Sequence, residues 1–175
     1  MVKRSFLLLL LGDDRPGLVE AISRTAADHD ASWQESRLVR LQGQFAGVIR
    51  VECLPESAAS LQAALEALEM TMVIRSVDED SVREACRSIT LELTGPERPG
   101  IIREWSTAVT ALGINVDELE SDCVSAPWTG ELLFRAKARL AVPSSVSLQR
   151  LRDDLERVGH EMTLEIDWIE HSSPV

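Results

Sequence analysis

The chain has 175 residues, of which 45% are hydrophobic and 27% charged, as in an ordinary globular protein. This length allows one large domain or two small ones. The 29 acidic residues outnumber the 18 basic ones and give a formal net charge of −11, which argues against direct binding to nucleic acid. No apolar stretch approaches the roughly 20 residues that a membrane helix needs.

The first predicted element is a strand ending at Gly12. Its residues, MVKRSFLLLLLG, could also begin an export signal, because two cations precede an apolar run. However, SFLLLLLGDDRPGLVEAIS (Ser5 to Ser23) aligns without a gap with SITLELTGPERPGIIREWS (Ser88 to Ser106), where no signal can lie. The run is also at the short limit of a signal core and has no small-x-small cleavage site. The repeat therefore predicts a strand and a cytoplasmic protein.

The rest of the first half reads as helix, strand, strand, helix, strand. Pro16 is expected at the first helical position, and Gly17 is expected to allow close backbone packing. The alternation and spacing of apolar residues predict a helix to about Asp28, strands at 33–41 and 45–53, a helix at 57–68 and a strand at 71–77. LLLLL places leucine on both faces of the first strand, so either that strand is unusually buried or its outer face is covered by another domain or subunit. We favour an interface.

The second half repeats this plan. LPESAASLQ from Leu54 resembles VPSSVSLQ from Val142, and EMTMVIRSV from Glu69 resembles EMTLEIDWI from Glu161. The expected domains are 1–80 and 88–175, with a linker at 81–87. The expected elements are a strand at 89–94, a helix at 99–112, strands at 115–123 and 131–141, a helix that buries Leu148, Leu151, Leu155 and Val158 and stops at Gly159, and a strand at 162–169.

Charged residues alternate with apolar ones on two strands of the second half. Glu118, Glu120 and Asp122 would stand opposite Arg135, Lys137 and Arg139 if the two strands form a hairpin in register. The cationic row could be a nucleic-acid patch, but a cross-strand ladder of ion pairs explains it more simply. One sheet face is thus expected to be covered by helices and the other to be polar.

The most distinctive motifs are the twin loops GDDRPG and GPERPG. Each follows a strand and opens a helix, whose free N–H groups and positive dipole end can hold a carboxylate. The donors would be the amides of Gly17, Leu18, Gly100 and Ile101. Asp14 and Glu97 could then meet an ammonium group, so that the loops suit a free amino acid. Equally, the acids could only offset the dipole and the glycines only let the turn pack.

The sequence lacks a complete motif for nucleotide binding, metal binding or nucleophilic catalysis. The two Gly-x-x-x-x-Gly spacings resemble a phosphate loop, but Leu18-Val19 and Ile101-Ile102 stand where Lys and Ser/Thr are needed. The three histidines have no metal-ligand spacing to one another or to cysteine. No nucleophile elbow is present, although a triad assembled in space has no local signature. We therefore expect no catalysis, metal or cofactor. The three cysteines are expected to be reduced and buried.

Two βαββαβ units, each with (D/E)-R-P-G at its first strand-to-helix loop, resemble tandem ACT domains. The pairing and length resemble the glycine cleavage system transcriptional repressor group. The resemblance implies an α+β fold of two ferredoxin-like units, each an antiparallel sheet with two helices on one face. It also implies side-by-side domain pairing, with a small ligand held between a first-helix loop and the start of a second strand of the paired domain.

The resemblance points to ligand-binding positions residue by residue. In the loops these are Asp14, Arg15, Gly17, Leu18 and Glu97, Arg98, Gly100, Ile101. Asn115 in LGINVDEL matches an asparagine that contacts ligand, whereas Ser32 occupies this position in the first half. Glu97 stands where aspartate is usual, so the two sites are expected to differ in affinity, or one to be inactive.

The function implied is a non-enzymatic sensor of a free amino acid, with glycine and serine as candidates. It would bind at the junction of the two halves and influence transcription of amino-acid metabolism through a protein partner. A homodimer is compatible with this reading. The alternative is an adaptor or regulatory subunit that keeps the fold, binds no amino acid and acts only by protein–protein interaction.

Overall fold

The structure is a computed structural model that describes residues 3–77, 86–127 and 129–169. The chain divides into two compact units, Met1–Ser81 and Val82–Val175. Each unit is described by itself.

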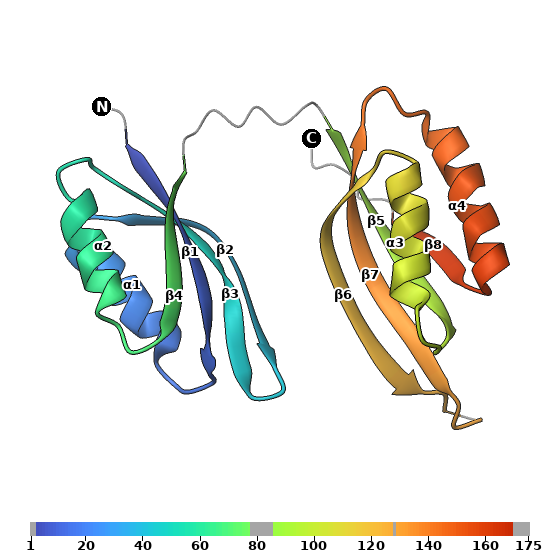
Figure 1. Cartoon of the computed structure of the whole chain (residues 1–175), viewed down its shortest axis with the longest axis horizontal. Coiled ribbons are helices and arrows are strands. Elements are labelled where there is room, and N and C mark those ends of the chain that lie inside the picture. The colour runs from blue at the N-terminus through green and yellow to red at the C-terminus, as the bar shows by residue number, and fades with distance from the viewer. Residues whose placement is uncertain (1–2, 78–85, 128, 170–175) are drawn as a thin grey trace. The chain divides into compact units, whose positions relative to one another are not determined.

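Unit 1 is a four-stranded sheet with two helices. Its elements are β1 (Arg4–Asp13), α1 (Leu18–Asp28), β2 (Ser32–Leu41), β3 (Gln44–Cys53), α2 (Ala58–Glu66) and β4 (Thr71–Val77). The strand order is β2-β3-β1-β4, and every neighbouring pair is antiparallel (Figure 1). The apolar run that opens the chain is therefore the central part of β1.

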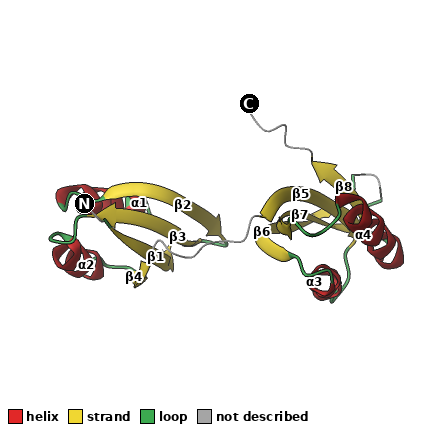
Figure 2. Ribbon diagram, turned by 90° about the horizontal axis from the view of Figure 1, so that it is seen from above, coloured by secondary structure: helices red, strands yellow, loops and turns green. Residues whose placement is uncertain are grey.

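Unit 2 repeats the same topology. Its elements are β5 (Cys86–Pro96), α3 (Ile101–Ala111), β6 (Asn115–Ser125), β7 (Leu132–Pro143), α4 (Leu148–Met162) and β8 (Glu165–Ile169). The strand order is β6-β7-β5-β8, again antiparallel throughout. In each unit both helices cover one face of the sheet, as Figure 2 shows. This confirms the predicted α+β fold of two ferredoxin-like units.

Each unit has its own hydrophobic core between sheet and helices. In unit 1 the inward residues of β1 pack against α1 and α2, and the core includes Phe6, Leu8, Leu10, Ile22, Ile49, Leu61 and Leu65. In unit 2 the equivalent core includes Leu91, Leu93, Trp105, Val109, Leu140, Leu151 and Leu155. The alternation of buried and exposed positions along the strands is what fixes which face the helices cover.

The first helix of each unit begins later than predicted. Leu18 and Ile101 are the first helical residues, so Pro16 lies in the preceding turn and not at the first helical position. Gly17 and Gly100 precede the helices in the left-handed conformation, with φ of 93° and 90°. A Cβ at Gly17 would meet nothing within 4 Å. Gly17 is therefore required by the sign of φ and not by close packing, which corrects the expectation.

The last helix ends later than predicted. Gly159 lies inside α4, Met162 is its last residue, and Thr163 caps it with φ of 58°. A Cβ at Gly159 would lie 2.8 Å from the carbonyl oxygen of Leu164, so this glycine permits close packing of the helix against the chain that follows. The predicted stop at Gly159 and strand start at Met162 were both wrong. Leu148 is exposed rather than buried, because it is the first residue of the helix.

Several smaller expectations have mixed outcomes. Cys53 is buried as expected, but Cys86 and Cys123 are exposed. Cys86 lies on the open face of β5, whereas Cys123 is opposite Phe134 on the edge strand β6. Most of the expected linker, residues 81–85, and the hairpin-tip Trp128 lie outside the described residues. Over the described ranges, none of the helices combines the length and the apolar character that crossing a bilayer requires.

Candidate ligand-binding site

The Arg-Pro-Gly loop of unit 1 presents backbone donors and a cation at one end of the sheet. Because Gly17 turns the chain just before α1, the amides of Gly17 and Leu18 have no acceptor among the described residues. Arg15 reaches from this loop to the start of β4. Its Nη2 donates to the carbonyl oxygen of Glu69 at 3.0 Å, and its Nη1 lies 3.9 Å from the Glu69 carboxylate.

A cavity of about 210 Å³ adjoins this loop. It is lined by Leu10, Leu11, Gly12, Asp13, Arg15, Leu18, Phe45, Glu69 and Met70. Gly12 follows the inward series of β1, and a Cβ at this position would meet nothing within 4 Å. The absence of a side chain at Gly12 therefore keeps the cavity open. Apolar walls with one guanidinium and two carboxylates are a fitting environment for a small zwitterion.

The acids of this loop are placed differently from one another. Asp14 does not line the cavity, because its carboxylate is paired with Nε of Arg40 at 2.5 Å. Asp13 does line it and accepts a hydrogen bond from Nε2 of Gln44 at 2.8 Å. The acids nearest to a ligand in this cavity are therefore Asp13 and Glu69.

The equivalent loop of unit 2 has its arginine bound within its own unit. Nη1 and Nη2 of Arg98 donate to the two carboxylate oxygens of Glu104 in α3, at 2.8 and 2.6 Å. These hydrogen bonds hold the pKa of Glu104 below its usual range. The amide of Ile101 donates to the carbonyl of Arg98 at 3.4 Å, while Glu97 is exposed. Ion-pair formation leaves Arg98 with fewer free donors than Arg15.

An open cavity of about 460 Å³ adjoins this second loop. It is bounded by residues 97–103 and by Ser121, Asp122, Cys123 and Phe134 of β6 and β7. Gly95 does not line it. A Cβ at Gly95 would lie 2.7 Å from the carbonyl oxygen of Thr163, so this glycine serves packing where Gly12 borders a cavity.

Asn115 and Ser32 lie at the other end of their sheets. Asn115 pairs with Ala141, and Ala141 pairs with Ser88 near the start of β5. The loop of unit 2 instead follows Pro96, at the end of β5. Eight residues of strand separate the two levels by roughly 27 Å. Ser32 is likewise level with Ser5, far along β1 from Gly12. No single unit brings its second-strand residue to its own loop, and Asn115 Nδ2 instead donates to Asp117 at 3.1 Å.

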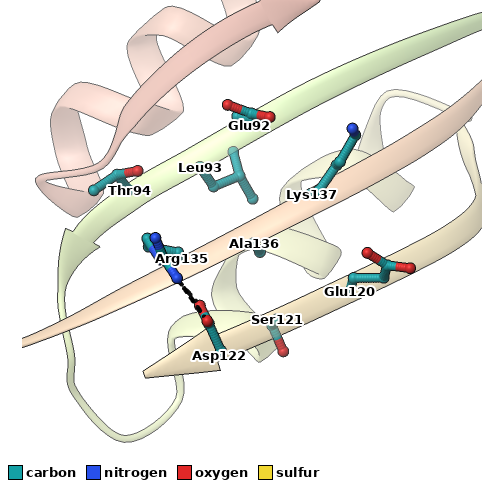
Figure 3. Close-up of a pocket in the computed structure, with 9 residues that line it drawn as sticks. All are labelled: Glu92, Leu93, Thr94, Glu120, Ser121, Asp122, Arg135, Ala136 and Lys137. Atoms are coloured by element: carbon teal, nitrogen blue, oxygen red, sulfur yellow. Dashed lines mark hydrogen bonds and ion pairs between the residues drawn. The ribbon is translucent and has the colours of Figure 1, made fainter. Parts of the chain in front are cut away.

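A further groove of about 410 Å³ lies on the open sheet face of unit 2, where charged side chains gather (Figure 3). The predicted ladder is present in the register: Glu118 faces Arg139, Glu120 faces Lys137 and Asp122 faces Arg135. Ion pairs join Arg135 to Asp122 at 2.7 Å and Arg139 to Glu118 at 2.8 Å. Because cations and anions already pair across the strands, this groove is a weaker candidate than the loops.

The described residues also bear on catalysis. They hold no group of three His, Cys, Asp or Glu side chains that could bind a metal ion. His29 Nδ1 lies 3.1 Å from Ser60 Oγ, but both side chains are exposed and the hydroxyl donates to the carbonyl of Ser57 at 3.0 Å. This pair therefore lacks the activated nucleophile that hydrolysis requires.

Comparison with known proteins agrees with the topology. Residues 4–75 match the model of the ACT domain family. A crystal structure of a protein of unknown function from Galdieria sulphuraria is 30% identical, with a TM-score of 0.84 over 97% of this chain and 99% of that one. A structure named "putative glycine cleavage system transcriptional repressor" is 12% identical, with a TM-score of 0.72 over 98% of this chain and 100% of that one. The search of curated proteins gave no match.

Residues 4–75 belong to the ACT domain family, and the whole chain shares its two-unit architecture with both of these structures. The match of the first unit supports a regulatory, ligand-sensing role. The sequence alone pointed to the loops but missed Phe45, Glu69 and Met70, which complete the cavity of unit 1 from β3 and from the segment just before β4. The only available signal was that EMTMVIRSV recurs in the second half.

Proposed function

We propose that this protein is a non-enzymatic sensor that binds a free amino acid at its Arg-Pro-Gly loops. The observation that carries the proposal is the cavity of unit 1, which Arg15, Asp13 and Glu69 line together with apolar side chains. Beside it lie the amides of Gly17 and Leu18, which find no acceptor within the described part of the chain. A ligand carboxylate would accept hydrogen bonds from these amides and from Arg15. A ligand ammonium group would then face Asp13 or Glu69.

The two loops are proposed to differ in affinity. Arg15 is held by one backbone carbonyl and a long carboxylate contact, so most of its donors remain available. Arg98 would have to give up its two hydrogen bonds to Glu104 before it could bind a ligand. The loop of unit 1, with Asp14, Arg15, Gly17 and Leu18, is therefore the stronger site. The loop of unit 2, with Glu97, Arg98, Gly100 and Ile101, is the weaker one.

Ser32 and Asn115 enter this proposal only through a second ACT domain. Each lies at the opposite end of its sheet from the loop of the same unit. A ligand that contacts both a loop and a second-strand residue would therefore need two domains brought together, and a homodimer is one way to supply them.

The direct test is calorimetric titration of the protein with each proteinogenic amino acid, starting with glycine and serine. The blocking variant is Gly12→Val, because a Cβ at Gly12 would meet nothing within 4 Å and the two further methyl groups would take up space in the cavity. Its control is Ala63→Val, which adds methyl groups to an exposed position of α2. Binding that Gly12→Val abolishes and Ala63→Val preserves supports the sensor. Silence across the panel at millimolar ligand refutes it.

We further propose that the sensor acts on the expression of amino-acid metabolism through a protein partner. The support is the shared fold with the repressor-named structure and the net charge of −11, which disfavours direct contact with a nucleic-acid backbone. A ligand can regulate the partner only if it binds one state of the protein more tightly than another. Capture of partners with and without the bound amino acid tests this step.

An adaptor that binds no amino acid is the second candidate. One observation favours it: the sheet of unit 1 exposes large apolar side chains on the face that its helices do not cover. Such a surface is typical of protein–protein contacts. The titration panel separates the two candidates, because only the sensor responds to it.

A further inference from the structure

We propose that the open sheet face of unit 1 binds the same face of a second copy of the chain, forming a two-fold symmetric dimer. The apolar face consists of Leu7, Leu9, Leu11, Val39, Val48 and Val73. The cross-strand register places these six side chains on one side of the sheet, while Phe6, Leu8 and Leu10 point to the helices. Five of the six are between 36% and 56% exposed, and Leu7 is half-buried.

The second unit shows that this apolar face is not a requirement of the fold. The gapless repeat sets Leu7, Leu9 and Leu11 of β1 against Thr90, Glu92 and Thr94 of β5. On the equivalent strands the neighbours are Lys137, Arg139 and Asp167, so the open face of unit 2 is charged. The same sheet is therefore stable with a polar outer face. Exposing leucines in unit 1 is unfavourable in water, unless another surface covers them.

The arrangement of side chains on the apolar face is self-complementary. The strand order β2-β3-β1-β4 allows a two-fold axis parallel to the strands, running between β1 and β3. This axis places β2 of one copy over β4 of the other, and β3 over β1. Each row of residues paired across the strands of one copy then lies opposite the same row of the other copy. Leu9 then meets Val48 of the other copy, and Leu11 meets Ala46. Two sheets packed with nearly aligned strands are a common arrangement.

The charges at the edge of this face fit the same axis. Glu35 on β2 and Arg75 on β4 belong to the same row of paired residues across the sheet. Glu35 pairs with Arg50, Arg50 pairs with Leu7, and Leu7 pairs with Arg75. In the dimer, Glu35 of each copy would face Arg75 of the other. Within its own copy, Glu35 lies 3.4 Å from Arg37, in a pair whose side chains are both more than half exposed. One interface would thus contain two intermolecular ion pairs related by symmetry, with Leu7 and Arg50 between them at the same level of the sheet.

The size of this face sets the expected strength of the dimer. Four strands about 4.8 Å apart and about seven residues long cover roughly 450 Å² in projection on each copy. A standard stable interface buries about 800 Å² per partner. Since side-chain relief adds to the projected area, we expect a dimer that forms reversibly in the micromolar range.

Sedimentation velocity of the full chain from low micromolar to millimolar concentration is the test. Leu9→Glu introduces the residue that unit 2 carries at the equivalent position, and its two copies in the interface should weaken dimerisation at least ~100-fold. Val19→Glu is the matched control, because Val19 is an equally exposed apolar residue on α1, on the helix side of the unit. Far-UV circular dichroism and thermal unfolding verify that both variants remain folded.

A charge exchange tests the geometry and not only the apolar contact. Glu35→Arg alone and Arg75→Glu alone should each weaken the dimer about tenfold, since each places like charges opposite one another. The double variant carrying both changes should restore dimerisation to within about threefold. A wild-type chain that stays monomeric throughout the concentration range overturns the proposal. A dimer that is insensitive to Leu9→Glu, or that the double variant fails to restore, also overturns it.

Discussion

Gly12 and Gly95 occupy equivalent positions in the repeat, yet the structure assigns them different roles. A Cβ at Gly95 would lie 2.7 Å from the carbonyl oxygen of Thr163 and 2.6 Å from Cδ2 of Leu164. The leucine can move, but the carbonyl belongs to the chain between α4 and β8. Such overpacking typically costs 1–3 kcal/mol, so we expect Gly95→Ala to destabilise unit 2 by about 2 kcal/mol.

Gly12→Ala provides the internal control. Its Cβ would meet nothing within 4 Å and its φ is not positive, so the substitution should change stability by less than about 0.5 kcal/mol, or raise it slightly. Urea unfolding with hydrogen exchange read in each unit separately measures both effects. For a unit of this size, 2 kcal/mol corresponds to a fall of roughly 8–16 °C in Tm. Equal effects of the two alanines would refute the packing difference.

Three further predictions concern caps and charge. Gly17→Ala should destabilise unit 1 by about 1 kcal/mol in urea titrations, because alanine disfavours φ of 93°. Thr163→Gly should raise the stability of unit 2 by about 1 kcal/mol, because a β-branched residue caps α4 at φ of 58°. Arg135 lowers the pKa of Asp122. This pair therefore stabilises the fold above the unfolded pKa of about 3.9 and loses its effect as pH falls through the lower folded pKa. Asp122→Asn should reduce the change of unfolding free energy with pH in this range, which urea titrations at several pH values measure. NMR titration of the carboxyl group gives the pKa of Asp122 directly.

Much of the fold was predictable because the two halves of the sequence are repeats of one another. The repeat identified SFLLLLLG as a strand and gave the order of elements in both halves, and all twelve elements are present. The alternation along 132–140 correctly predicted a polar sheet face and its ion-pair ladder. These predictions held because hydrophobic periodicity is local, and a second occurrence of the same pattern removes most of the ambiguity.

Element ends and glycine roles were less predictable, since they depend on contacts between distant segments. Gly159 looks like a helix stop, but it lies against Leu164 and the helix continues for three residues. Pro16 looks like a first helical residue, but the left-handed Gly17 sets the start of α1. Sequence gives the residue type that a cap or a close approach requires. It does not say which of the two roles that residue has.

The site shows the same limitation. The Arg-Pro-Gly motif is identical in both halves and does not itself distinguish Arg15 from Arg98. The difference arises because Glu104 lies six residues after Arg98 and reaches it with both oxygens, whereas Arg15 contacts the distant Glu69. Ala21 occupies the repeat position of Glu104 in unit 1, so no carboxylate stands six residues after Arg15. The lack of a carboxylate at this position is what leaves Arg15 available.

The proposed dimer and the proposed ligand site meet at one residue. Leu11 contributes to the apolar face of β1 and also lines the cavity beside Gly12. A ligand that shifts Leu11 would therefore change the dimer interface, and dimerisation would change the cavity. Thermodynamic linkage requires the two effects to be equal: the factor by which ligand alters the dimer dissociation constant is the factor by which dimerisation alters ligand affinity. Sedimentation with and without saturating amino acid, and calorimetry of wild-type and Leu9→Glu protein, measure these two factors independently. Coupling is expected at about 5-fold or more if Leu11 transmits it, and two unchanged constants would show that binding and assembly in unit 1 are independent.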